Sequence, residues 1–159
     1  MTPMAPVRQW LVERLTEYAS YCEAFGLARP TVYEWYPSEV PFDRFPIVMV
    51  GKLQSSLVSL ALPELFEQRH VYSVVGAVYS PDPRESILQQ EWYADLWLDY
   101  VHQHPHRFRM HASEFYTSDT WTPQVTMTPV YIQEHPLHGW SCEVMVTRIV
   151  RGGTRGDGS

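Results

Sequence analysis

The side chains best suited to chemistry are six histidines in two groups: His102, His104, His106 and His111, then His135 and His138. Imidazole nitrogens are common ligands of zinc, and alternate histidines around a proline can hold a metal in extended chain. No carboxylate stands at a familiar ligand spacing from them, so the metal pattern is loose. We therefore predict solvated histidine loops, no bound metal and no cofactor. A small metal-binding protein is the alternative, which metal analysis of the purified chain would separate.

Other catalytic patterns are missing from the sequence. It contains neither a glycine loop that cradles phosphate nor a nucleophile elbow. Cys22 and Cys142 fit no metal or redox spacing, and we predict buried free thiols in a reducing compartment. Glu91, Asp95 and Asp99 form an acidic row at i, i+4 and i+8 of a predicted helix, without a histidine partner. We expect a solvated acidic face there, and a protein that is not an enzyme.

The composition predicts one globular domain. The chain has 159 residues, of which 45% are hydrophobic and 19% charged, and this length allows a sizeable core. No apolar run reaches the length of a membrane span, and no signal peptide is expected before the first helix. The net charge of −6 argues against non-specific DNA binding. Aromatic residues make up 14% of the chain and Lys52 is its single lysine against eleven arginines. This bias is typical of protein interfaces, although a GC-rich genome also favours arginine.

A strand followed by a long helix is the element around which the fold is predicted to be organised. Residues 70–79 are rich in β-branched and aromatic side chains and are apolar on both parities, which is typical of a strand covered on both faces. Asp82 can then cap a helix, Pro83 suits its first position and Glu85 completes a capping box. The helix is predicted to end near Val101, because a proline follows.

This helix carries two apolar rows. The wider row is predicted to be the core face: Ile87, Tyr93, Ala94, Trp97, Leu98, Tyr100 and Val101. Leu88, Trp92 and Leu96 form a second row beside the acidic one. Either this row widens the core face, or it meets another subunit, because a tryptophan between two leucines is a poor solvent face.

The N-terminal part of the chain is predicted to contain a second helix and an aromatic segment. The helix runs from Pro6 to Phe25 and is ended by Gly26, a good residue for the C′ position. Its core face comprises Val7, Leu11, Leu15, Tyr18, Cys22 and Phe25. Residues 27–46, the aromatic segment, include Trp35 and Tyr36. We expect this segment to be ordered, since disordered segments are poor in aromatic residues.

Two connections and a short strand complete the first three quarters of the chain. Residues 47–50 predict a buried strand closed by a glycine. Residues 53–67 mix serines and leucines around a proline, and we predict a loop or irregular turn. Residues 107–123 form a long connection that holds three candidate contact residues, namely Phe115, Tyr116 and Trp121.

The C-terminal part predicts a hairpin. Residues 125–133 alternate, and Pro129 marks an edge or bulged strand because it lacks a ladder donor. Residues 140–150 alternate as a half-buried antiparallel strand. The prediction is a single α+β domain over 1–151 with a flexible tail at 152–159. Its order is α-β-β-α-β-β, with a four-stranded, mainly antiparallel sheet and both helices on one face.

The order and character of these elements resemble the tail terminator and neck proteins of long-tailed bacteriophages. The resembling segments cover most of the chain: Val7–Phe25, Pro46–Val50, His70–Tyr79 leading into Asp82–Val101, and Val125–Val150. The resemblance implies a structural virion protein that forms a homo-oligomeric ring, usually of six copies. Such a ring caps the tail tube and joins it to the head connector, so the tail tube and connector proteins are the implied partners. It also implies location in the virion tail or neck after assembly in the host cytoplasm, without a membrane.

A ring of this kind makes demands on the surface of its subunit. Ring contacts are heterologous, so two different patches of one subunit must fit each other. The candidates for these patches are Leu88, Trp92, Leu96, Trp35, Tyr36, Phe115, Tyr116 and Trp121. DNA passes through without specific binding, and an acidic lumen suits this because attraction would hold the phosphates. The lumen candidates are Glu91, Asp95 and Asp99. Another neck or connector ring protein, and a monomeric module that binds a partner through residues 27–46, remain alternatives.

Overall fold

The computed structural model of the chain describes residues 6–60, 64–103, 111–112, 115–117 and 123–151. For residues 52, 111–112, 115–117 and 151 it describes the backbone alone. The elements follow in the order α1 (Pro6–Ala24), β1 (Thr31–Tyr33), the 3-10 helix η1 (Phe42–Arg44), β2 (Ile47–Ser59), β3 (Leu65–Val78), α2 (Pro83–Gln103), β4 (His111–Ala112), β5 (Phe115–Thr117), β6 (Val125–Ile132) and β7 (His135–Arg151). The predicted tail at 152–159 lies outside the described residues.

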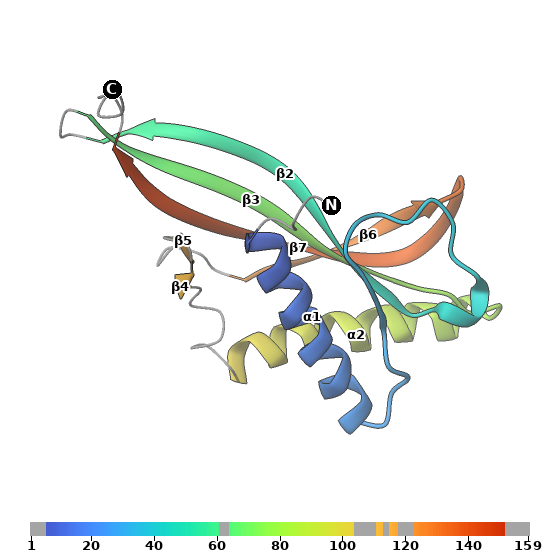
Figure 1. Cartoon of the computed structure of the whole chain (residues 1–159). Coiled ribbons are helices and arrows are strands. Elements are labelled where there is room, and N and C mark those ends of the chain that lie inside the picture. The colour runs from blue at the N-terminus through green and yellow to red at the C-terminus, as the bar shows by residue number, and fades with distance from the viewer. Residues whose placement is uncertain (1–5, 61–63, 104–110, 113–114, 118–122, 152–159) are drawn as a thin grey trace.

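The chain is an α+β protein, as predicted, with a mixed sheet and two helices. The described strands follow the order β1-β2-β3-β7-β5-β4, and β6 pairs with β7 as well. Strand β1 is parallel to β2, and the other pairs are antiparallel. Figure 1 shows both helices on the same side of the sheet. No helix in the described part of the chain is long and apolar enough to cross a membrane.

The four-stranded sheet was wrong, because seven strands are found among the described residues. The three additional strands are only two or three residues long: β1 in the aromatic segment, and β4 and β5 in the predicted connection. A strand this short shows no periodicity in the sequence, since alternation is recognised over four to eight residues. Each is held by pairing with a neighbouring strand: β1 with β2, β5 with β7, and β4 with β5.

The loop predicted over 53–67 was also wrong. Strand β2 continues to Ser59 and β3 begins at Leu65, so most of this stretch is a paired hairpin with a register shift between Lys52 and Gln54. Figure 1 shows that this hairpin and the end of β7 project beyond the helices. A strand that extends beyond the core does not need an apolar residue at every second position. The serines around Leu57 were therefore not recognised as part of a strand.

The main core lies between the helices and one face of the sheet. At its centre, Trp97 of α2 and Trp140 of β7 stack with ring centroids 6.1 Å apart, and Tyr18 of α1 meets Trp97 edge-on at 5.4 Å. The Tyr18 hydroxyl donates a 2.6 Å hydrogen bond to the carbonyl of Tyr93, so this buried polar group is satisfied. Trp140 lies across Gly76, its partner on β3, where a Cβ would come within 2.2 Å of the indole.

A smaller core covers part of the opposite face of the sheet. Seven buried side chains form it, from β2, β3 and the β6–β7 hairpin: Ile47, Met49, Val75, Ala77, Val130, Ile132 and Leu137. Tyr33, Val40 and Phe45 of the aromatic segment pack against these residues. The expectation that this segment is ordered is therefore confirmed. Within the described strands β6 pairs only with β7, which confirms the edge position predicted from Pro129.

The helix boundaries follow from local capping. The Asp82 carboxylate accepts a 3.0 Å hydrogen bond from the amide of Arg84 at the start of α2, and Pro83 is the first helical residue, as predicted. Glu85 does not complete a capping box, because its carboxylate accepts a hydrogen bond from the Ser80 hydroxyl instead. At the end of α1, Gly26 has a φ of +82°, which glycine adopts without strain.

Candidate interaction surface

The second apolar row of α2 lies at the protein surface. Trp92 is 47% exposed and Leu88 is exposed to a similar degree, while Leu96 is half-buried against the main core. Ile87, predicted to face the core, is exposed as well. Ser86 and Gln90 are buried in its place.

Polar partners explain why Ser86 and Gln90 can be buried. The Ser86 hydroxyl lies 2.8 Å from Nδ1 of His138, and the Gln90 amide donates a 2.5 Å hydrogen bond to the carbonyl of Gly139. These bonds attach α2 to the start of β7. Because they lie on the core side of the helix, they leave the second apolar row facing outward.

An open apolar groove adjoins this row. It has a volume of about 350 Å³ and is lined by Phe25, Leu27, Trp92, Asp95 and Leu96. We call these residues the helix groove. It exists because α1 ends at Ala24 and the chain turns at Gly26, which leaves Phe25 59% exposed beyond the helix. The prediction that Phe25 belongs to the core face was therefore wrong.

The three residues of the acidic row beside the groove differ in their exposure to solvent. Glu91 and Asp95 are exposed. Asp99 is half-buried and accepts a hydrogen bond from the Tyr21 hydroxyl of α1. Burial, with this hydrogen bond, raises the pKa of Tyr21 to about 12. Asp99 therefore helps to join the helices, and Glu91 and Asp95 are the members that present charge to solvent.

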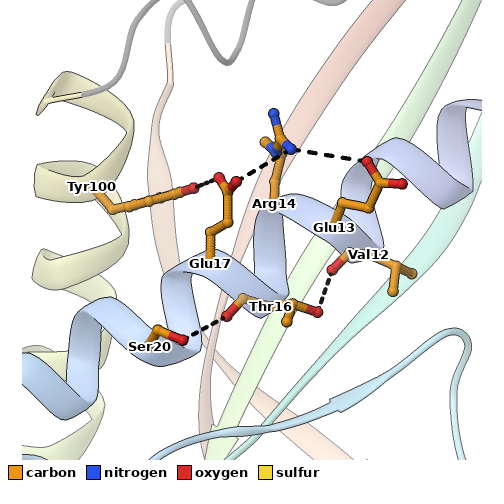
Figure 2. Close-up of polar contacts among 7 residues, drawn as sticks. All are labelled: Val12, Glu13, Arg14, Thr16, Glu17, Ser20 and Tyr100. Atoms are coloured by element: carbon orange, nitrogen blue, oxygen red, sulfur yellow. Dashed lines mark hydrogen bonds and ion pairs between the residues drawn. The ribbon is translucent and has the colours of Figure 1, made fainter.

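A second polar contact fixes the two helices that form the groove. Figure 2 shows the Glu17 carboxylate between Arg14 of its own helix and Tyr100 of α2. The Tyr100 hydroxyl donates to Glu17, and an Arg14 nitrogen lies 3.4 Å from the other carboxylate oxygen. Glu13 approaches the same Arg14 group at 3.9 Å. Charge-assisted contacts between partly buried side chains hold the geometry of the helix pair better than solvated ones do.

A second apolar surface lies on the projecting part of the sheet. We call this part the β-arm; it comprises residues 51–59 of β2, 65–70 of β3 and 146–151 of β7. Leu57 is 59% exposed, and Leu53 of the same strand is exposed too. Ile149 is exposed on the opposite face of the β-arm, because the register aligns it with Val58 rather than with Leu57. Beyond Met49, the outer edge of β2 pairs with no described strand. The sequence analysis did not predict this surface. The feature that could have indicated it is the pair of leucines, Leu53 and Leu57, among serines.

The aromatic candidates Trp35 and Tyr36 are exposed but lie away from the helix groove. Tyr36 lies beside Gly51, within 3.8 Å of where a Cβ would stand on β2. Arg8 of α1 holds this segment at the sheet edge: its guanidinium donates to the carbonyl of Glu34 and, at 2.8 Å, to that of Val50. The structure therefore does not bring these aromatic residues together with the Trp92 row.

Three further contact candidates fall in the connection after α2. Phe115 and Tyr116 belong to β5, which pairs with Val146 and Thr147 of β7 and is described as backbone alone. Trp121 lies outside the described residues.

The histidines whose side chains the structure describes are distributed over the molecule rather than gathered. His102 and His135 are exposed, and His138 is half-buried against Ser86. A seventh, His70, is buried with Nδ1 3.0 Å from the Ser55 hydroxyl. Of the remaining candidates, His104 and His106 lie outside the described residues, and His111 is described as backbone alone. Within the described part of the chain, no three histidine, cysteine or acidic residues are grouped so as to hold a metal ion.

The contact of Ser86 with His138 is the described arrangement closest to a nucleophile and its base. Ser86 is only 4% exposed, however, and no carboxylate of the described residues hydrogen-bonds to His138. The geometry accounts for the contact as an attachment between α2 and β7. The two cysteines are buried free thiols, as predicted, and burial raises the pKa of Cys22 to about 11.

Comparison of the chain with models of known protein families, and with curated proteins, finds no match.

Proposed function

We propose that this chain is a structural virion protein, a phage tail terminator whose ring caps the tail tube and joins it to the head connector. The observation that carries the proposal is the presence of two separate apolar surfaces on one subunit, the helix groove and the β-arm. Patches larger than scattered single residues mark interaction sites. Two different patches on one chain suit head-to-tail contacts, which close into a ring when the rotation allows it.

The order of the helices and main strands also supports the proposal. An N-terminal helix precedes a hairpin, a crossover helix follows, and a final hairpin completes the sheet. This is the element order through which the sequence resembles tail terminator and neck proteins. Another neck or connector ring protein is the nearest alternative, because it would use the same two surfaces.

The net charge of −6 suits a channel for DNA, since a mildly repelling wall does not retain phosphates. Glu91 is the exposed acid that we assign to such a wall or to its rim, because Asp95, although exposed, lines the helix groove. Asp99 contributes less to the field outside, because the Tyr21 hydroxyl occupies its carboxylate.

Assembly tests the proposal directly. Native mass spectrometry and negative-stain imaging, with and without purified tail tubes, should show closed rings of the full-length chain, six copies being the expected number. Dialysis against a chelator should leave ring formation and the melting temperature unchanged, since a structural metal would contribute folding energy. A chain that stays monomeric and also fails to bind tail tubes would reject the ring, and loss of the fold on chelation would favour the metal-binding alternative.

A further inference from the structure

We propose that the β-arm of one subunit docks in the helix groove of the next copy, with Leu53 and Leu57 covering Trp92 and Phe25. The occupant is thus a second copy of this chain. The inference rests on the proposed ring and specifies which two surfaces form its repeated contact. Four observations carry it: reach, apolar match, charge and an uncovered strand edge.

Reach makes the contact intermolecular. Nine residues of β2, from Gly51 to Ser59, extend about 30 Å at a strand rise of about 3.3 Å per residue. Figure 1 shows this part of the sheet running away from both helices, while the C-terminal end of α1, which the groove residues Phe25 and Leu27 follow, points the other way. The β-arm therefore cannot fold back onto its own groove, but it is long enough to lie across a neighbouring subunit.

The two surfaces match in their apolar character. The groove is open and lined by four apolar side chains, Phe25, Leu27, Trp92 and Leu96, with room for leucine side chains in its volume of about 350 Å³. On the β-arm, Leu53 and Leu57 are exposed and come from one strand. Burial of a tryptophan near the centre of a contact typically supplies much of the binding energy.

The charges of the two surfaces are opposite. Helix α2 carries four acidic residues, Glu85, Glu91, Asp95 and Asp99, against a single arginine. On the β-arm, Arg148 lies on the same face as Leu57, because Leu57 pairs with Gln68 and Gln68 with Arg148. Arg69 lies on the other face, where Glu67 is its ion-pair partner. Asp95 lines the groove itself. Opposite charge at the rim of a contact favours correct pairing and excludes arm-to-arm association.

The outer edge of β2 is a further feature that favours docking. Beyond Met49 no described strand pairs with it, so the backbone groups of residues 51–59 line an open edge. An open edge with apolar side chains is a site for pairing with other chains unless it is blocked or covered. Docking on a neighbouring subunit covers both the edge and the two leucines.

Disulfide trapping tests the contact on the full-length chain. The native thiols are buried. Cross-links between new surface cysteines can therefore be detected without replacing the native cysteines. A chain with Leu57→Cys and Phe25→Cys should, after mild oxidation of the assembled protein, give a ladder of covalent multimers on a non-reducing gel. Each single variant should give none. The matched control combines Phe25→Cys with Ile149→Cys, because Ile149 is exposed on the β-arm but lies on a different strand from the docking leucines; it should cross-link far less.

A variant without new thiols provides a second measurement. Leu57→Ser should raise the concentration needed for assembly by roughly tenfold or more, as loss of an interface residue does, while the melting temperature of the monomer stays unchanged. Rings that form without cross-links and tolerate Leu57→Ser would overturn the docking while leaving the proposed ring intact. Cross-links of Leu57→Cys with itself would also overturn it. A wild-type chain that never assembles, alone or on tail tubes, would overturn both proposals.

Discussion

The main core and the β-arm use the same three strands in opposite ways. Near the helices, Val74, Val144 and their neighbours on β3 and β7 are fully buried. Farther along these strands, Ile149 and the leucines of β2 are exposed. The buried part contributes most of the stability, because most of the apolar side chains removed from water lie there. The exposed part contributes little to the monomer, and for that reason it remains available for a partner.

The two tryptophans of α2 show the same contrast within one helix. Trp97 is fully buried between Tyr18 and Trp140, whereas Trp92 is half-exposed beside the helix groove. They are five positions apart in the sequence, so they point to different sides of the helix. A side chain of the same type therefore serves the fold in one case and offers a contact surface in the other.

The largest expected loss of stability follows from a change at Trp97. Trp97→Ala should lower the free energy of unfolding by about 3–5 kcal/mol, because a large cavity opens in the aromatic core. Trp92→Ala should cost only about 1 kcal/mol, since much of its indole is already in water, while assembly weakens. Urea unfolding followed by circular dichroism, with sizing of the folded protein, measures both.

Asp95→Ala is the stability control for this pair, because an exposed acid should change the free energy of unfolding by less than about 0.5 kcal/mol. Equal losses for Trp92→Ala and Trp97→Ala would assign Trp92 to the monomer core and reject the interface. Normal stability together with normal assembly of Trp92→Ala would reject both roles.

Substitutions at two glycines compare the packing of the core with the packing at the start of the β-arm. At Gly76 a Cβ would lie 2.2 Å from the Trp140 indole, so Gly76→Ala should lower the free energy of unfolding by about 1–3 kcal/mol through overpacking. At Gly51, where the β-arm begins, the nearest atom would be at 3.8 Å. Gly51→Ala should therefore leave stability unchanged or raise it by up to about 1 kcal/mol. Thermal unfolding of the two variants compares them, and a larger loss at Gly51 would show that the arm is packed tightly.

The smallest expected effect is a pH dependence of stability that arises from a thiol in the core. Burial raises the pKa of the Cys22 thiol from 9.0 to about 11. The unfolded chain therefore releases this proton first, and the contribution to stability is complete below pH 9 and is lost as the pH rises to about 11. The free energy of unfolding, measured by denaturant titration across this range, should fall less steeply for Cys22→Ala than for the wild type.

Burial also raises the pKa of Cys142 and, to about 12, that of Tyr93, so part of the slope should remain in the Cys22→Ala variant. The exposed β-arm supplies a control, since Leu57→Ser should leave the slope unaltered. Identical slopes for the wild type and Cys22→Ala would mean that the thiol is not shielded in the folded state.

Some of the fold was accessible from local sequence. Asp82 and Pro83 begin α2 and Gly26 follows the end of α1, because capping and turn residues act over a few neighbouring positions. Apolar periodicity correctly predicted the buried face that includes Leu11 and Leu15. For the candidate site, the helical pattern placed Trp92 in a row beside the core face, and the structure has it exposed; its role in a subunit contact stays a prediction.

Other features were decided only by the tertiary structure. Phe25 lies on the apolar side of its helix pattern but is exposed, because the helix ends one residue earlier and none of the described elements covers that position. Gln90 is polar but buried, because the carbonyl of Gly139 happens to face it. The β-arm has no alternating pattern, since pairing between distant strands, and not burial, holds Leu57 in place. Local sequence thus sets where the helices begin and which of their faces are apolar. Long-range pairing decides which apolar residues remain at the surface, because burial depends on what the rest of the chain places beside them.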